Sequence, residues 1–177
     1  SGGTIDVRNV GFSYGDHEVL KDVSFVINAG ERVSLVGASG AGKSTLAQIM
    51  IGLDVPSRGS IEVNGVDTRV ADLRSLRERV GYVFPENQII PGTVLENITL
   101  GRTVTQEDLQ WTLRMAHLTD SVRDLPNGLD THLTATGENL SFGMRRRILF
   151  ARMIMSKPDV LIIDEAAFIP ETDQPAL

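Results

Sequence analysis

The sequence has no cysteine, which excludes a disulfide framework and any thiolate metal site. Aromatic residues make up only 5% of the chain, although the hydrophobic total of 41% is ordinary for a soluble α/β protein. There is no basic excess, and the net charge of −6 argues against broad nucleic-acid binding. Long apolar runs are also missing. The longest aliphatic stretch, Val160–Ile163, is far shorter than the roughly 20 residues of a membrane-spanning helix.

The 177 residues are enough for one globular domain with a real core. The N-terminus, Ser1-Gly2-Gly3, has no features of a secretory signal and is typical of a cloning remnant that precedes a first strand. Alternating polar and apolar residues predict antiparallel strands at Thr4–Arg8 and Val19–Ile27, and a β-branched run predicts a buried strand at Arg32–Val36. The other predicted elements are the helices Ser44–Leu53, Val70–Glu78, Thr93–Ile98, Gln106–Ala116, Asp120–Leu125 and Phe142–Met155, and the strands Ser60–Val63, Val80–Phe84 and Val160–Ile163. Thr105 is the predicted cap of the helix Gln106–Ala116.

A glycine-rich segment, Gly37–Ser44, matches the phosphate-binding pattern G-x-x-x-x-G-K-[ST] in full. It follows a predicted strand and opens a predicted helix, which is the context that this loop requires. Glycines permit positive φ and let backbone N–H groups surround phosphate oxygens. Lys43 can reach the β- and γ-phosphates, and Ser44 offers its hydroxyl to Mg²⁺. The segment predicts an ATP–Mg²⁺ site.

Four apolar residues predict a buried strand at Val160–Ile163, and two carboxylates follow it, where parallel α/β sheets place their ligands. We expect Asp164 to orient the Mg²⁺ shell and Glu165 to act as the general base that polarises the attacking water. The order of elements predicts an α/β fold with a P-loop NTPase core, a mixed or parallel sheet, an N-terminal antiparallel β subdomain and an inserted α-helical subdomain. The predicted core spans 4–90 and 156–177, and the helical subdomain spans about 91–155.

From about Thr4 to Glu165 the chain resembles the nucleotide-binding domain of an ABC transporter of the exporter type. The segments that carry this resemblance, beyond the two motifs above, are Gly11–Tyr14, Val19–Phe25, Pro56–Gly65, Leu73–Val83, Gly92–Ile98 and Leu125–Thr131. The resemblance implies that the ring of Tyr14 stacks on adenine. It implies an ATP-binding set of Tyr14, Gly37, Ala38, Ser39, Gly40, Ala41, Gly42, Lys43, Ser44 and Thr45.

The family signature Leu-Ser-Gly-Gly-Gln has the form Leu140-Ser141-Phe142-Gly143-Met144 in this chain. The resemblance implies that Ser141 and Gly143 approach the γ-phosphate held by a partner domain. Phe142 replaces a glycine and Met144 replaces an amide, so the signature is degenerate. The basic residues that follow, Arg145–Arg147 and Arg152, form either a solvated helix face or a support for the signature helix.

Other family features are altered as well. Pro85 stands where the family has a lid glutamine, for which Glu86 or Gln88 could substitute, and Ala135 replaces an acidic residue. No histidine follows Glu165, so the switch histidine and the final core strands of the family are absent from these 177 residues. The sequence leaves open whether the chain is a shortened piece or a diverged half-site.

These features predict an ATPase subunit that pairs as a homo- or heterodimer of nucleotide-binding domains and powers an attached transmembrane domain. It would be a soluble part at the cytoplasmic face of a membrane, with Mg²⁺ as cofactor and no nucleic-acid partner. We expect the isolated chain to bind ATP but to hydrolyse it weakly or not at all. One alternative is a regulatory half-site that binds ATP without efficient hydrolysis. Another is a non-transport ABC ATPase that acts on DNA or ribosomes, which the acidic charge disfavours.

Overall fold

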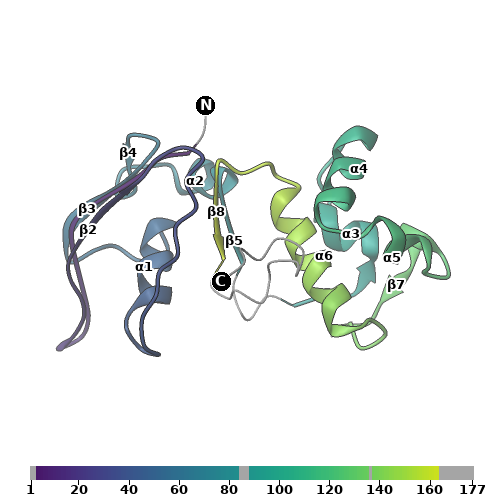
Figure 1. Cartoon of the computed structure of the whole chain (residues 1–177), viewed down its shortest axis with the longest axis horizontal. Helices are drawn as coiled ribbons and strands as arrows, with labels where there is room; N and C mark the ends of the chain where they lie inside the picture. The colour runs from purple at the N-terminus through teal and green to yellow at the C-terminus, as the bar shows by residue number, and fades with distance from the viewer. Residues whose placement is uncertain (1–2, 84–87, 136, 164–177) are drawn as a thin grey trace. The chain divides into compact units, whose positions relative to one another are not determined.

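The computed structural model describes residues 3–83, 88–135 and 137–163, which form two compact units. The sheet unit contains 3–82 and 158–163, and the helical unit contains the described residues of 83–157 (Figure 1). In these ranges no helix is both long enough and apolar enough to cross a membrane.

The sheet unit is built on four antiparallel strands in the order β2-β1-β3-β4. Their bounds are β1 Ile5–Tyr14, β2 His17–Ile27, β3 Arg58–Val63 and β4 Val66–Asp67. Apolar side chains on the inner face are fully buried, among them Ile5, Val7 and Ile61. The alternation in the sequence is the cause, because successive strand residues point to opposite faces. The predicted antiparallel β subdomain is confirmed.

A β-bulge interrupts the pairing of β1 with β3. Arg8 is opposite Ser60 and Gly11 is opposite Arg58, so β1 contains one residue more than β3 over this stretch. Gly59 fills the gap with φ at 78°, and a Cβ there would lie only 2.3 Å from the Arg8 carbonyl oxygen. The bulge therefore requires glycine for its left-handed conformation and for its close backbone contact.

Helix α1, Lys43–Met50, lies against the inner side of this sheet (Figure 1). Leu46, Ile49 and Met50 are buried, as the predicted apolar face requires. The predicted helix extends too far, because the chain turns after Met50 with Gly52 at positive φ. Leu53 consequently lies outside the helix and is 46% exposed.

The remaining elements of the sheet unit include α2, Leu73–Arg79, whose first turn is capped by Asp72. Strand β5, Val80–Val83, pairs with β8, Val160–Ile163, in a two-stranded sheet. The return of the chain into the sheet unit is fixed at Asp159, whose N–H donates to the Arg79 carbonyl oxygen at 2.8 Å.

The prediction of a buried strand at Arg32–Val36 is wrong for this structure. The segment has no strand conformation, and Val36 is 93% exposed. A β-branched run forms a strand only where a neighbouring strand satisfies its backbone groups. None of the described strands pairs with this segment, and among the described residues β8 pairs with β5 alone. For the same reason β8 is only partly buried, with Leu161 45% exposed, although the sequence predicts a buried strand.

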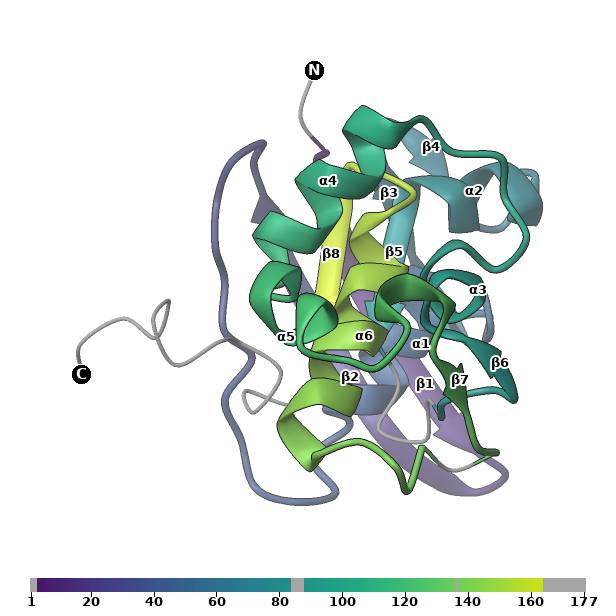
Figure 2. The ribbon, with the colours of Figure 1, turned by 90° about the vertical axis from the view of Figure 1, so that its right-hand side faces the viewer.

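The helical unit contains α3 Val94–Thr99, α4 Gln106–Met115, α5 Thr119–Arg123, a 3₁₀ turn η1 at Gly128–Asp130 and α6 Phe142–Ile154. Two short strands that the sequence does not predict, β6 Gly92–Thr93 and β7 His132–Leu133, pair antiparallel. Helix α6 packs against α3 and α4, and in the view of Figure 2 α3 is drawn on one side of it and α4 and α5 on the other. Its contacts with α3 bury Val94, Ile98 and Ile148 completely.

The starts of these helices follow from their capping residues. Thr93 and Glu96 form a reciprocal capping box at α3, and the hydroxyl of Thr105 accepts from the Asp108 N–H at α4. The predicted cap at Thr105 is confirmed.

We expect Gly59→Ala to lower the free energy of unfolding by more than about 2 kcal/mol, because it adds a backbone clash to the strain of positive φ. Gly65→Ala is the matched control, since Gly65 has φ at 76° and open space around its Cα. The control should lower that free energy by only about 1 kcal/mol. Urea unfolding measures both, and equal losses would contradict the close contact at Gly59.

Candidate nucleotide site

The phosphate-binding pattern forms a loop that leads directly into α1. Residues 37–41 are exposed, and Gly42 is the N-cap of the helix with φ at 85°. No side chain of the described residues caps the helix start. The first-turn N–H groups of a helix need acceptors, and phosphate oxygens at this position would supply them.

Gly42 is held against β2. A Cβ at this position would lie 2.7 Å from Cδ2 of Leu20 and 3.0 Å from Cγ1 of Val19. Leu20 is itself buried, so it has little freedom to move aside. Positive φ and this close approach together explain why residue 42, the second fixed glycine of the pattern, has to be glycine.

The Lys43 side chain folds back over the loop. Its Nζ donates to the carbonyl oxygens of Gly37 and Ala38, each at 2.8 Å. The cationic head therefore lies inside the arc that the loop backbone forms. A phosphate group entering this arc would meet one full positive charge together with the amide donors of the helix start.

Ser44 and Thr45 follow in the first turn of α1. Ser44 is exposed, while Thr45 is buried at 8% exposure and serves the packing of the helix. The exposed Ser44 hydroxyl is a hard oxygen ligand of the kind that Mg²⁺ prefers, so this residue fits the predicted role. The structure gives Thr45 no comparable access.

Tyr14 ends β1 in the same unit, at the tip of the hairpin with His17. Its ring is 51% exposed and meets the ring of Phe12 edge-on, with centroids 4.9 Å apart. This contact fixes the orientation of the ring and leaves much of its surface accessible, which a stacking role requires.

The signature residues lie in the helical unit, at the start of α6. The Ser141 Oγ accepts from the Met144 N–H at 3.2 Å and thereby caps the helix. Phe142 is 60% exposed, and the guanidinium of Arg146 lies 4.1 Å from the centre of its ring. Around Gly143 the nearest atom that a Cβ would meet is the Arg147 Nη2, at 3.8 Å. Met144 is buried in the core of the unit.

Asp164 and Glu165 lie outside the described residues, as do Pro85 and Glu86. Gln88 is described and exposed, and its carbonyl oxygen accepts from Arg152. The structure thus brings Tyr14 and the loop of residues 37–45 into one unit and Ser141 and Gly143 into the other.

The sequence model of the ABC transporter family matches residues 20–168 of the chain. The chain belongs to the ABC transporter family. It is 39% identical over 176 residues to an uncharacterised ABC transporter ATP-binding protein, YwjA, of Bacillus subtilis. The matched residues make up 98% of this chain and 31% of YwjA. Over 167 residues it is also 39% identical to a putative multidrug export ATP-binding/permease protein of Staphylococcus aureus, which covers 93% of this chain and 29% of the relative.

A solved bacterial ABC exporter of the Atm1 family, with ATP bound, is similar in structure. Its TM-score is 0.87 at 32% identity, with 97% of this chain and 31% of that chain covered. The predicted P-loop NTPase fold and the exporter-type resemblance are confirmed. This ABC cassette spans about a third or less of the length of these relatives. Members of the family are generally ATPases that use Mg²⁺ with ATP.

We expect Lys43→Ala to weaken the binding of ATP–Mg²⁺ by about 10- to 100-fold, the effect of losing charge-assisted hydrogen bonds. Lys21→Ala removes the same charge from an exposed position on β2 and should leave the affinity unchanged. Titration calorimetry compares the two variants with the wild type. Equal affinities for all three proteins would show that the nucleotide binds elsewhere.

Proposed function

We propose that the chain is the ATP-binding and ATP-hydrolysing cassette of an exporter, which powers transport through an attached transmembrane domain. The observation that carries this proposal is the loop at residues 37–44. It presents the start of α1, with its first N–H groups uncapped by any described side chain, next to the Lys43 ammonium. This combination of donors and charge suits the β- and γ-phosphates of a nucleotide.

The phosphate tail is proposed to replace the two carbonyl oxygens as the partner of Lys43. The ion–ion attraction to phosphate then takes the place of two ion–dipole contacts. The backbone of residues 37–42 supplies N–H donors without side chains in the way. The adenine ring is proposed to stack on the exposed surface of Tyr14.

The exposed Ser44 hydroxyl at the start of α1 fits Mg²⁺, and the carboxylate of Asp164 is proposed as a second oxygen ligand. When bound, the ion neutralises the charge that develops on the phosphates. Ser44 and Asp164 would hold it and keep the phosphate tail in place. Glu165 is proposed to take a proton from the attacking water, which makes it the catalytic base.

The second half of the site is proposed to come from another nucleotide-binding domain, either a second copy or a related subunit. Ser141 and Gly143 lie at an exposed, capped helix start, and a Cβ at Gly143 would have only ordinary contact with the Arg147 Nη2 at 3.8 Å, so that a partner's phosphate could approach the backbone there. Hydrolysis would release the pair and let the membrane domain change its state. A single chain lacks this second face, so we propose that the isolated chain binds ATP and hydrolyses it slowly.

We expect Tyr14→Ala to weaken the binding of ATP by about 1–3 kcal/mol, the contribution of base stacking on an aromatic ring. Inorganic tripolyphosphate has no base, so its affinity should not change. Tyr14→Phe keeps the ring and should bind ATP as the wild type does. Calorimetric titrations of the wild type and both variants measure these affinities. A similar loss of affinity for ATP and for tripolyphosphate in Tyr14→Ala would argue against stacking.

We expect Glu165→Gln, introduced into the complete protein, to reduce ATP turnover by at least about 100-fold through loss of the general base. ATP affinity should stay within about twofold, because the amide preserves the shape of the side chain. Steady-state phosphate release and equilibrium binding separate the two effects. Undiminished turnover in this variant would contradict the role of Glu165, and a wild type without turnover would contradict hydrolysis itself.

A further inference from the structure

Asn97 of α3 is a fully buried polar residue whose side chain is completely occupied by one stretch of backbone and one arginine. Its Oδ1 accepts from the Ile90 N–H at 2.9 Å, and its Nδ2 donates to the carbonyl oxygens of Ile90 at 2.9 Å and Thr93 at 3.0 Å. These bonds satisfy a buried amide. They also fix the connecting segment, residues 88–93, onto α3.

Arg152 in the last turn of α6 completes this network. Its Nε donates to the Asn97 carbonyl oxygen at 2.7 Å, its Nη2 to the Asn97 Oδ1 at 2.8 Å and its Nη1 to the Gln88 carbonyl oxygen at 3.1 Å. One planar guanidinium thus joins α6, α3 and the connecting segment.

The surroundings of Arg152 make its positive charge costly to bury. Burial lowers the pKa of its guanidinium, because the surrounding protein solvates the cation less well than water does. Its three acceptors are carbonyl oxygens of neutral groups. Burying a cation against such acceptors costs desolvation energy that an apolar side chain of similar size would avoid. We therefore take the role of Arg152 to be that of fixing α6, α3 and the connecting segment relative to one another, which an apolar side chain could not do by hydrogen bonds.

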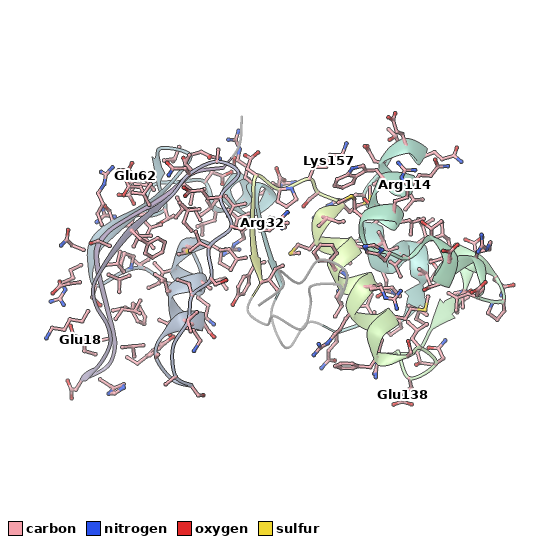
Figure 3. All side chains as sticks on the ribbon, in the orientation of Figure 1. Glu18, Arg32, Glu62, Arg114, Glu138 and Lys157 are labelled. Atoms are coloured by element: carbon pink, nitrogen blue, oxygen red, sulfur yellow. The ribbon has the colours of Figure 1, made fainter. Side chains whose placement is uncertain are left out.

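The network lies where the chain passes from one unit into the other. Strand β5 ends at Val83, and the described chain resumes at Gln88, the residue that Arg152 binds. Ser141 and Gly143 lie at the opposite end of α6. Figure 3 shows this separation, with Glu138 just before the start of α6 and Lys157 just after its end. A helix of 13 residues is a stiff rod of about 20 Å, so a movement of one end is passed to the other.

We propose that Arg152 and Asn97 are positioning residues for ATP turnover. They lock the connecting segment to α6, so that a displacement of this segment moves the signature residues as part of one rigid body. The proposal rests on the function proposed above. Neither residue touches the nucleotide in this scheme. Their effect is on the placement of Ser141 and Gly143 during hydrolysis.

Asp108 of α4 provides a control in the same unit. Its Oδ1 accepts from the Lys157 Nζ and forms an ion pair with it. This pair ties α4 to the segment that follows α6, away from the connecting segment and from the signature residues. Replacing Asp108 by asparagine removes the charge of this pair and leaves the 88–93 anchor intact.

The test uses the complete protein with Arg152→Lys, Asn97→Ala and Asp108→Asn, and measures kcat, the KM for ATP and the melting temperature. We expect Arg152→Lys and Asn97→Ala to lower kcat about tenfold or more, since misplacement by about an ångström has effects of that size. The KM for ATP should stay within about twofold, because the proposed ATP-binding set lies in the sheet unit. Asp108→Asn should keep kcat within about twofold whatever its melting temperature.

A double variant and hydrogen exchange complete the test. Asn97→Ala combined with Arg152→Lys should be no slower than the slower single variant, because both changes break one network. The Ile90 amide should exchange faster in Asn97→Ala and as in the wild type in Asp108→Asn. Losses of kcat that follow the melting temperature for all three variants, or additive effects in the double variant, would overturn the positioning role. An active wild type with unaffected variants would overturn only this role, whereas an inactive wild type would overturn the proposed hydrolysis.

Discussion

The contact between Gly42 and β2 is the constraint on which the proposed nucleotide site depends. Leu20 and Val19 approach so closely that no side chain fits at residue 42. The first turn of α1 is therefore held directly against a strand whose own position is fixed by pairing along β1. Because β1 also carries Tyr14 at its end, one antiparallel hairpin places both the phosphate loop and the aromatic ring. Packing of an ordinary hydrophobic sheet thus defines the geometry of a polar site.

Local patterns predicted much of this arrangement. The loop that leads into α1, the antiparallel hairpin and the cap at Thr105 each depend on residues close together in the sequence, and the structure contains all three. The strand predicted at Arg32–Val36 shows the limit, because strand formation depends on a partner that β-branched residues cannot specify by themselves. The Asn97–Arg152 network was not predictable either. Its two members are 55 residues apart, and neither has an unusual sequence context.

The two substitutions in the signature have different physical meanings. Phe142 is exposed at the helix start and stacks with Arg146, while Gly143 is also exposed and has no tight contact at the place of a Cβ. Residue 143 is glycine, so no side chain of its own covers the backbone that a phosphate would approach there. Met144 turns inward and packs in the core of the helical unit, so an apolar residue there adds buried surface. The two substitutions therefore alter this helix start less than a comparison of the motif sequences suggests.

The Lys43 ammonium bridges two carbonyl groups of its own loop, and this has a kinetic consequence for the proposed function. The two hydrogen bonds hold the loop in its curve through contacts within the chain. In the proposed function, a nucleotide would exchange these contacts for its own and would not have to order the loop first. Its association rate would then be set by diffusion and by the attraction between opposite charges, which salt screens.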